Sequence, residues 1–337
     1  TVLTSLVVTM NGDTTTTIII CVAAFIELWK QMKMNLLYLA VIIVTPIGIF
    51  NQLPWGGPTI AASTAMGVEI STLFAALLPG LLVAAVYAVI MAYIIGLKER
   101  KRLNFDPKDA KDVSPETIQG MLNAIRDNEP ELKRPKMWWF NLIMTLAILA
   151  MLIMDIAHGG ILFMLGAAIA LTANYRSSKL VTERLDALAA DSLAPALATL
   201  AAGVFSGILT GSGMATALAE GITKIIPEAL GTHMAPIYAI ISAPAITFLP
   251  QDAFYFGIAS VMAGVMGQFG ITPDQAAVAS MVGQAFRLIS PVIPALYMLC
   301  EYTEINFVDF QKGYIKFAWP ILFIYIIVYG ITGVMPL

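Results

Sequence analysis

The chain has 337 residues, of which 58% are hydrophobic and only 12% are charged, and its mean hydropathy is +0.81. Soluble domains carry about 25% charged residues, so the composition excludes a soluble domain and indicates an integral membrane protein. The net charge of −3 and the mixing of acidic with basic residues give no indication of nucleic-acid binding.

Apolar runs along the chain predict membrane-crossing helices. Residues 70–96, 137–154, 159–174 and 314–335 each come close to the roughly 20 apolar residues that span a bilayer as a helix. Alternation with a period of two residues is absent, which argues against a transmembrane barrel. We therefore predict an all-α, multi-pass protein of the cell's inner (plasma) membrane.

Residues 97–136 form the only long polar segment and hold 10 of the 19 Lys and Arg residues. Because basic residues are enriched in loops on the inner side of a membrane, this segment is predicted to be cytoplasmic. A second charged stretch, near 175–190, has the pattern of an amphipathic helix that lies on the inner surface.

Two polar interruptions sit inside apolar sequence, at NGDTTTT (11–17) and at PQDAFYF (250–256). Each is followed by a second segment that Gly or Pro breaks, namely 50–63 and 283–295. Irregular backbone at membrane depth is tolerated only where it is buried in protein or lines a wet cavity. Paired broken segments in corresponding halves indicate a secondary transporter built from inverted repeats, with half-helix N-termini facing an anionic substrate.

Charged residues within membrane segments are expensive, so Asp13, Asp252 and Arg287 are candidate functional residues. Alternatives remain open for each kind of feature. Asp13 could only cap the helix that follows it, Arg287 could form a structural ion pair, and residues 56–58 could be a helix kink without a ligand.

The two cysteines, Cys21 and Cys300, lie far apart and without CxxC spacing, which predicts packing residues and neither a disulfide framework nor a zinc site. His158 and His233 fall at predicted outer turns and are expected at the surface. A proton-relay histidine is the alternative.

The motifs NGDTTTT, LPWGGPT, DAFYFG and GQxxxLxSP resemble those of the citrate–metal:proton symporter family (CitMHS type) of the ion transporter superfamily, and the similarity covers nearly the whole chain. The resemblance implies two inverted repeats, each with scaffold helices, a re-entrant hairpin and a discontinuous helix. It also implies a homodimer that works by an elevator motion.

The resemblance divides the chain into four parts. They are the first hairpin, broken helix and following helix (1–96), the cytoplasmic loop (97–136), the scaffold helices of the second repeat (137–231), and the second hairpin, broken helix and last helix (232–337). Scaffold helices of the first repeat would precede residue 1, so we expect them to be missing from this chain.

The family resemblance implies a transporter and no enzyme, which takes up citrate complexed with a divalent cation, Mg²⁺ or Ca²⁺, together with protons. No permanent cofactor is expected. Asp13 and Asp252 would carry protons or approach the metal. The implied substrate-binding residues are Asn11, Gly12, Asp13, Thr14, Thr15, Asn51, Gly56, Gly57, Pro58, Thr59, Gln251, Asp252, Gln284, Arg287, Ser290 and Pro291.

Three positions depart from the family pattern. Asn11 stands where aspartate is common, Arg287 where histidine is usual, and Ile60 where arginine often follows GGPT. Loss of a carboxylate and gain of a guanidinium favour a free or more negative carboxylate over a nearly neutral metal complex. We predict that Arg287 contacts a substrate carboxylate.

Three other functions compete with this interpretation. An intramembrane aspartyl protease would use two aspartates that share a proton, but Met10 stands where its pattern requires glycine. A channel fits paired hairpins and broken helices less well than alternating access does. A cation–proton antiporter of the same superfamily is the nearest alternative.

Overall fold

A computed structural model describes residues 1–104, 119, 134–154, 156–157, 159–175, 177–224, 227–231 and 233–337. Most of the predicted cytoplasmic loop and His158 lie outside these residues. The described residues form helices joined by turns and contain no strand, which confirms the all-α prediction for this part of the chain.

The first part of the chain, up to residue 102, contains five helices. They are α1 (Val2–Thr9), α2 (Thr14–Gln31), α3 (Leu36–Phe50), α4 (Gly57–Met66) and α5 (Ile70–Arg102). Helices α1 and α2 pack together as a hairpin and both contact α3. The chain is then irregular between α3 and α4, because Pro54, Gly56 and Gly57 follow one another closely.

The last part of the chain repeats this order of elements. It contains α12 (Met234–Phe248), the π-helix η4 (Ala253–Ala259), α13 (Ser260–Gln268), α14 (Pro273–Val282), the 3-10 helix η5 (Gly283–Ile289), α15 (Pro294–Tyr302) and α16 (Phe307–Ile331). Helix α12 and the η4–α13 pair form a second hairpin against α14. The chain is irregular again between η5 and α15, and α16 corresponds in order to α5.

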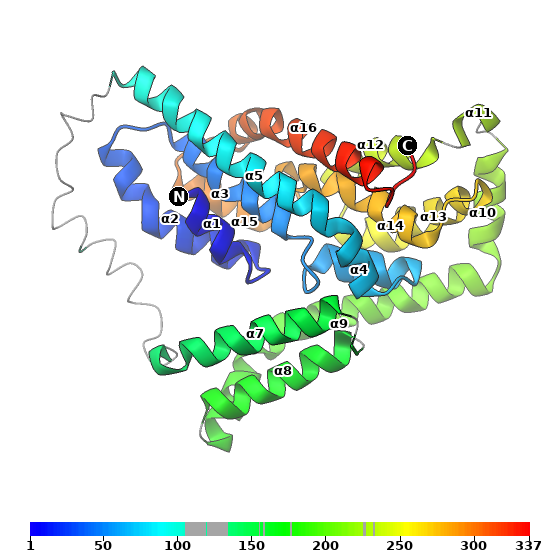
Figure 1. The fold of residues 1–337 in the computed structure, drawn as a ribbon, viewed down its shortest axis with the longest axis horizontal. Helices are drawn as coiled ribbons and strands as arrows, with labels where there is room; N and C mark the ends of the chain where they lie inside the picture. The colour runs from blue at the N-terminus through cyan, green and yellow to red at the C-terminus, as the bar shows by residue number, and fades with distance from the viewer. Residues whose placement is uncertain are drawn as a thin grey trace.

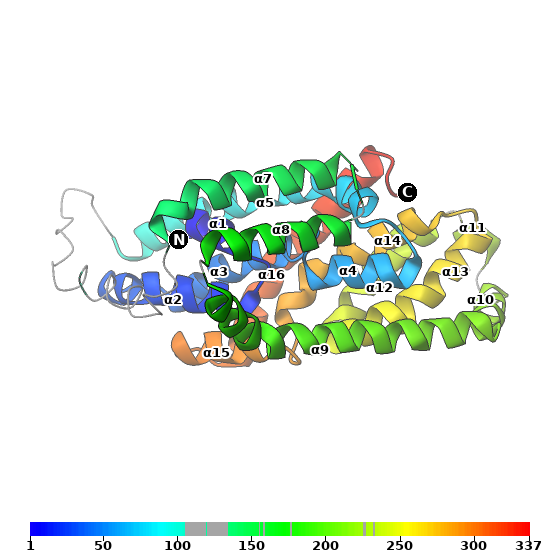
Figure 2. The same cartoon turned by 90° about the horizontal axis from the view of Figure 1, so that it is seen from below.

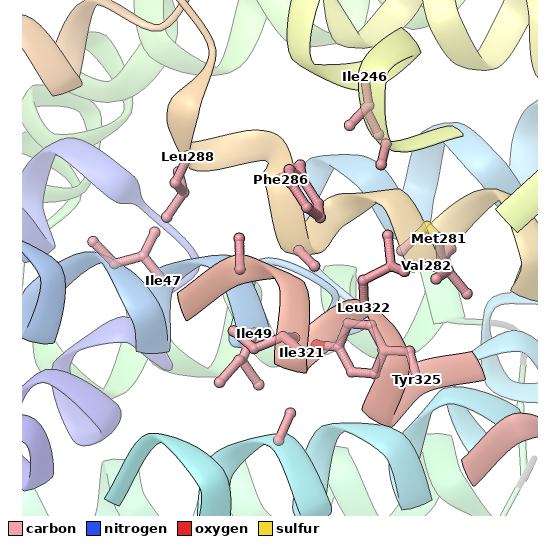
Figure 3. Packing of buried hydrophobic residues seen from close by; sticks show 14 of the residues in the cluster. Ile47, Ile49, Ile246, Met281, Val282, Phe286, Leu288, Ile321, Leu322 and Tyr325 are labelled. Atoms are coloured by element: carbon pink, nitrogen blue, oxygen red, sulfur yellow. The ribbon is translucent and has the colours of Figure 1, made fainter. Parts of the chain in front are cut away.

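The two parts share one apolar core. Helix α16 packs along α5, and η5 lies against α3, α12 and α16. Figure 3 shows Ile49 of α3 beside Ile321 and Tyr325 of α16, and Ile47 of α3 beside Leu288 of η5. All of these side chains are buried, so the irregular segments sit beside a closely packed centre.

The middle of the chain forms a separate layer beneath this core (Figures 1 and 2). This layer comprises the short η3 (Pro135–Met137) with α7 (Trp138–Ile153), α8 (Gly159–Asn174) and α9 (Ser178–Gly211). Helices α10 (Met214–Thr223) and α11 (Glu228–Gly231) follow at the far end of α9, where α10 packs on α13 (Figure 1). The stretch predicted as an amphipathic helix near 175–190 is the first part of α9, which continues without interruption for 34 residues. His233 is exposed just before α12.

Within the described residues, three helical stretches are long and apolar enough to cross a membrane. They are Ile70–Arg102, Pro273–Tyr302 and Phe307–Ile331, and shorter apolar helices accompany them.

Candidate functional site

Two irregular segments and two hairpin turns make up the candidate site. We name residues 51–56, between α3 and α4, break 1, and residues 290–293, between η5 and α15, break 2. The turn of the first hairpin, residues 10–13, is tip 1, and that of the second, residues 249–252, is tip 2. The sequence-predicted site residues lie in these segments and in the helix ends beside them.

Tip 1 rests on break 1 through Trp55. The indole Nε1 donates to Met10 O at 3.0 Å, and the ring lies against Gly12. Gly12 has a φ of +83°, a left-handed conformation that glycine adopts without strain. A methyl group added there would lie 2.7 Å from Trp55 Cδ1, so glycine is needed for the close approach as well.

Asp13 caps helix α2, as the alternative structural role for this residue predicts. Its Oδ2 accepts from Thr16 N at 2.6 Å, and its own N–H donates to Asn11 Oδ1 at 2.7 Å. The Asp13 side chain is exposed, as is Thr15, whereas Thr14 is half-buried. Both carboxylate and amide of tip 1 thus face the first turn of α2, where backbone N–H groups favour negative charge.

A hydrogen-bonded chain joins break 1 to the opposite half of the molecule. Asn51 Nδ2 donates to Gln284 Oε1 at 3.2 Å, and Gln284 Nε2 donates to Tyr255 OH at 2.7 Å. The Tyr255 hydroxyl lies 3.0 Å from Met281 Sδ. Gln284 is fully buried, so both ends of its amide are used within the protein in this arrangement.

Break 1 is a tight turn that leaves polar atoms unpaired. Gly56 N donates to Leu53 O at 2.7 Å, and a methyl group added at Gly56 would lie 2.0 Å from Asn51 O. Gln52 Nε2 donates to Tyr325 OH at 3.1 Å, while Gln52 Oε1 and Thr59 Oγ1 are buried without a partner. Helix α4 begins here with Gly56 as an N-cap that offers no side chain, so its N-terminus carries no side-chain cap.

Tip 2 approaches the start of α4. A methyl group added at Gly57 would lie 2.9 Å from Gln251 Nε2, so the Gln251 side chain reaches the backbone at the start of α4. Pro58 follows at the first positions of α4, where its missing N–H costs nothing. Asp252 is exposed at the start of η4 and its carboxylate makes no capping hydrogen bond.

Arg287 holds tip 2 in place. Its Nη1 donates to Ile246 O at 3.0 Å and to Leu249 O at 3.1 Å, two carbonyls at the C-terminal end of α12. A helix end leaves carbonyls without helical partners, and a cation there is favourable. The guanidinium forms no ion pair within the part of the chain that the structure describes, so the structural ion pair considered for Arg287 is absent there.

Side chains satisfy the polar groups of break 2. Ser290 Oγ accepts from Val292 N at 3.3 Å, and Gln311 Nε2 donates to Ile289 O at 2.6 Å. Tyr297 OH donates to Pro291 O at 2.9 Å. Ser290 is fully buried, whereas Pro291 is exposed.

The structure therefore brings tip 1 to break 1, tip 2 to the start of α4, and break 1 to η5. Sequence reasoning missed Gln52, Trp55, Tyr255 and Tyr325, which make the connecting contacts. Gln52 and Trp55 lie inside the interrupted segment 50–63, and polar groups within a broken apolar segment are a signal that points to them. Tyr325 had none, because it is one of several tyrosines in an apolar helix.

A cavity of about 340 Å³ lies between tip 1 and the α7–α8 pair. Met10 and Trp55 form one wall, and apolar residues of α7 and α8 form the other. Thr145 supplies the hydroxyl of the lining, but it already donates to Asn141 O at 2.8 Å. The chemistry of this cavity is apolar, so it does not suit a carboxylate.

Comparison with known proteins agrees with the motifs and the fold. The chain is 37% identical over 315 residues to "Citrate transporter" of Bacillus subtilis (strain 168), covering 93% of this chain and 71% of that protein. It is 31% identical over 318 residues to "Mg(2+)/citrate complex secondary transporter" of the same organism, again covering 93% of this chain and 71% of the relative.

Among solved structures, the YdaH transporter of Alcanivorax borkumensis matches with a TM-score of 0.60. The match covers 98% of this chain and 84% of that one at 11% sequence identity, so it shows a shared fold alone. The family model for "Citrate transporter" (CitMHS) matches residues 1–283. Family and relatives are transporters and not enzymes, which sets the protease alternative aside. The chain belongs to the citrate transporter (CitMHS) family.

Proposed function

We propose that this chain is a secondary transporter of citrate or a related di- or tricarboxylate in the inner membrane. The observation that carries the proposal is that both hairpin tips meet the segment around break 1, tip 1 through Gly12 against Trp55 and tip 2 through Gln251 against Gly57 at the start of α4. Broken helices whose N-termini converge provide N–H groups for an anion at membrane depth. The names of the relatives supply the substrate class.

The two halves are proposed to be inverted repeats. The order hairpin, interrupted helix, long helix occurs once in α1–α5 and once in α12–α16. The contacts between halves are reciprocal, because α4 packs on η4 as α15 packs on α2. Such a pair of halves supports alternating access, in which the hairpins and broken helices move as one unit against α7–α9. A homodimer would hold that second layer still.

Arg287 is the proposed carboxylate ligand on the cationic side of the site. Nη1 is tied to tip 2, whereas Nε and Nη2 bind no described residue and are not among the buried unpaired atoms. A guanidinium fixed at one corner can still offer two donors to a carboxylate. The first turns of α2 and α4, with Thr14, Thr15 and Thr59, add N–H and hydroxyl donors.

A divalent cation would travel as part of the substrate. Nowhere in the described residues do three or more His, Cys, Asp or Glu side chains converge to hold a metal, so citrate itself would supply most ligands. Asp252, which is exposed and uncapped, is the better placed of the two aspartates to approach that metal or to carry a proton. Protonation of Asp13 would also weaken its bond to Thr16 N and loosen the first turn of α2.

Calorimetry on the purified full chain tests the proposal, with citrate alone, citrate with Mg²⁺ or Ca²⁺, and succinate as the control acid. Binding that requires metal supports transport of the metal complex. Binding of free citrate supports a site in which Arg287 takes the place of the cation. If no carboxylate binds under any of these conditions, the proposal is overturned and cation–proton exchange becomes the function to test.

The proton-coupling role has its own test. Asp13→Asn and Asp252→Asn are compared in proteoliposome uptake between pH 5 and 8. We expect the Asp252 variant to lose the pH dependence of uptake and the Asp13 variant to keep it. An unchanged profile in both variants contradicts a role for either carboxylate as the proton carrier.

A further inference from the structure

Two stacked tyrosines connect break 1 to helix α5. Tyr329 OH donates to Leu77 O of α5 at 3.2 Å, and its ring stacks on that of Tyr325 with centroids 5.6 Å apart and planes 8° from parallel. Both side chains are fully buried. Gly80 makes room for this stack, because a methyl group there would lie 2.4 Å from Tyr329 Cε1.

Tyr325 is the member of this pair that reaches the break. Its hydroxyl accepts from Gln52 Nε2 at 3.1 Å, and Gln52 is the residue next to Asn51, which binds Gln284 in the other half. Two successive residues of break 1 are therefore held by different elements, Gln52 by α16 and Asn51 by η5. Figure 3 places the Tyr325 ring among the apolar side chains of α3, α14 and α16, where water cannot replace a lost partner.

The Gln52 amide has no second anchor. Its Oε1 is buried without a hydrogen-bond partner, so the bond to Tyr325 is the one polar contact of its side chain among the described residues. A buried amide that loses its last partner keeps the full desolvation cost and gains by moving elsewhere. Among the described residues, the Gln52 side chain is therefore held by this single hydroxyl.

We propose that Tyr325 is a positioning residue for the carboxylate site. Through Gln52 it holds break 1 in the arrangement in which Asn51 reaches Gln284 and Gly57 lies against Gln251. Tyr325 touches no substrate in this role. The inference rests on the proposed function, because it assigns the hydrogen bond between Tyr325 and Gln52, here called the tether, to that same carboxylate site.

The test compares Tyr325→Phe with Tyr329→Phe in the full chain. Each variant removes one hydroxyl from a fully buried tyrosine of α16, so general damage to the core is matched. We expect the KM for citrate uptake to rise about tenfold or more in Tyr325→Phe, because a buried amide is left unpaired, with little change in kcat. The KM of Tyr329→Phe should stay near that of the unmodified chain. Equal KM values in the two variants overturn the proposal.

A double-variant cycle separates the tether from independent effects. Gln52→Leu and Tyr325→Phe remove the two ends of one hydrogen bond, so the double variant should be no weaker in citrate binding than the weaker single variant. Losses that multiply instead show that the two residues act separately, which contradicts the proposal.

Trp55 reports on break 1 without any ligand. With Trp29, Trp138, Trp139 and Trp319 replaced by Phe, the remaining emission comes from the indole that packs on Gly12. We expect a shifted Trp55 emission in Tyr325→Phe and none in Tyr329→Phe. If Trp55 emission shifts in Tyr325→Phe but the chain binds no carboxylate, the positioning role of Tyr325 is supported and the proposed transport function is contradicted. If the emission does not shift and the KM is unchanged, only the positioning role of Tyr325 is contradicted.

Discussion

Break 1 and break 2 both interrupt a helix and free backbone polar groups, but different kinds of contact hold the two breaks. Break 2 covers its freed carbonyls and N–H groups with nearby side chains, from Ser290, Tyr297 and Gln311. Break 1 instead turns tightly at Gly56 and is held by partners far away in the sequence, Gln284 and Tyr325. It also keeps one buried polar atom unpaired, Gln52 Oε1, whereas break 2 keeps none.

This difference shows where the molecule can rearrange at low cost. A segment whose polar groups are satisfied locally keeps its shape when its neighbours move. A segment with unpaired buried groups gains from any arrangement that pairs them, by about 1–3 kcal/mol for each group. We therefore expect break 1 to change shape when substrate arrives and break 2 to follow tip 2 as a rigid unit.

The largest expected effect comes from adding a methyl group inside the tight turn of break 1. Gly56→Ala places a methyl group 2.0 Å from Asn51 O, which no side-chain movement relieves. We expect a destabilisation of about 4 kcal/mol or more, in the range reserved for severe steric conflicts, measured by thermal unfolding in detergent. The control is Gly96→Ala in α5, where a methyl group meets nothing within 4 Å and should stabilise by about 0.5–1 kcal/mol. Similar stability in the two variants would show that break 1 is not this tight turn.

The second test releases tip 2 from its cation. Arg287→Gln removes the charge-assisted bonds to Ile246 O and Leu249 O, so we expect a loss of about 2 kcal/mol in stability and at least tenfold in citrate affinity. Lys316→Gln, on the exposed face of α16, changes the net charge equally and should leave both unchanged. Uptake that is unaffected in Arg287→Gln rules out Arg287 as a substrate ligand.

A smaller effect is expected where break 2 is capped. Gln311→Leu removes the donor to Ile289 O and leaves that carbonyl partly buried, which should cost about 1 kcal/mol in unfolding free energy. Gln268→Leu, an exposed glutamine at the end of α13, is the matched control. If the two variants unfold at the same temperature, the side-chain hydrogen bonds at break 2 do not stabilise the fold. The two breaks would then differ less in how they are stabilised than their hydrogen bonds indicate.

The smallest effect is expected at the surface link between the halves. Lys30 Nζ and Glu304 Oε1 lie 2.6 Å apart, and this hydrogen bond lowers the pKa of Glu304 below its ordinary value of 4.5. The stabilisation is therefore complete above that value and is lost as the pH falls through the lower pKa of the folded state. Because both groups are exposed, Glu304→Gln should change the unfolding temperature slightly at pH 7 and not at all in acid or high salt. A large change in unfolding temperature at pH 7 would show that this ion pair contributes strongly to the packing of α2 against the segment after α15.

The sequence alone predicted the positions of the breaks better than their contacts. Gly56, Gly57 and Pro58 cannot continue a packed apolar helix, so the interruption after α3 could be predicted from residue type. The partner of Asn51 could not be, because Gln284 lies 233 residues away and only the packing of η5 on α3 brings it near. Asp13 is a third kind of case. Its role as the N-cap of α2 could be predicted from its position directly before a helix, independently of any role in transport.

Arg287 shows why a charged residue in an apolar segment is hard to interpret from sequence. Its cost at membrane depth predicts a partner but does not say which one. The carbonyls that it binds are available because α12 ends at Phe248, shortly before Pro250, and only the packing of η5 on α12 brings Arg287 to them. The prediction of a substrate contact stays a prediction, which the open Nε and Nη2 can still fulfil.

Helix α9 is too long to cross a bilayer in the ordinary way. Its 34 residues rise by about 51 Å, whereas the hydrocarbon layer is about 30 Å thick. To fit within that layer a straight helix would have to tilt by roughly 55°, beyond the usual range of about 0–40°. A helix of this length that crossed the bilayer would extend into the headgroup region, and the charged end that carries Lys179, Glu183 and Arg184 is the end suited to lie there. In a bilayer, the position of the charged end of α9 would set the depth of the second layer relative to the membrane surface.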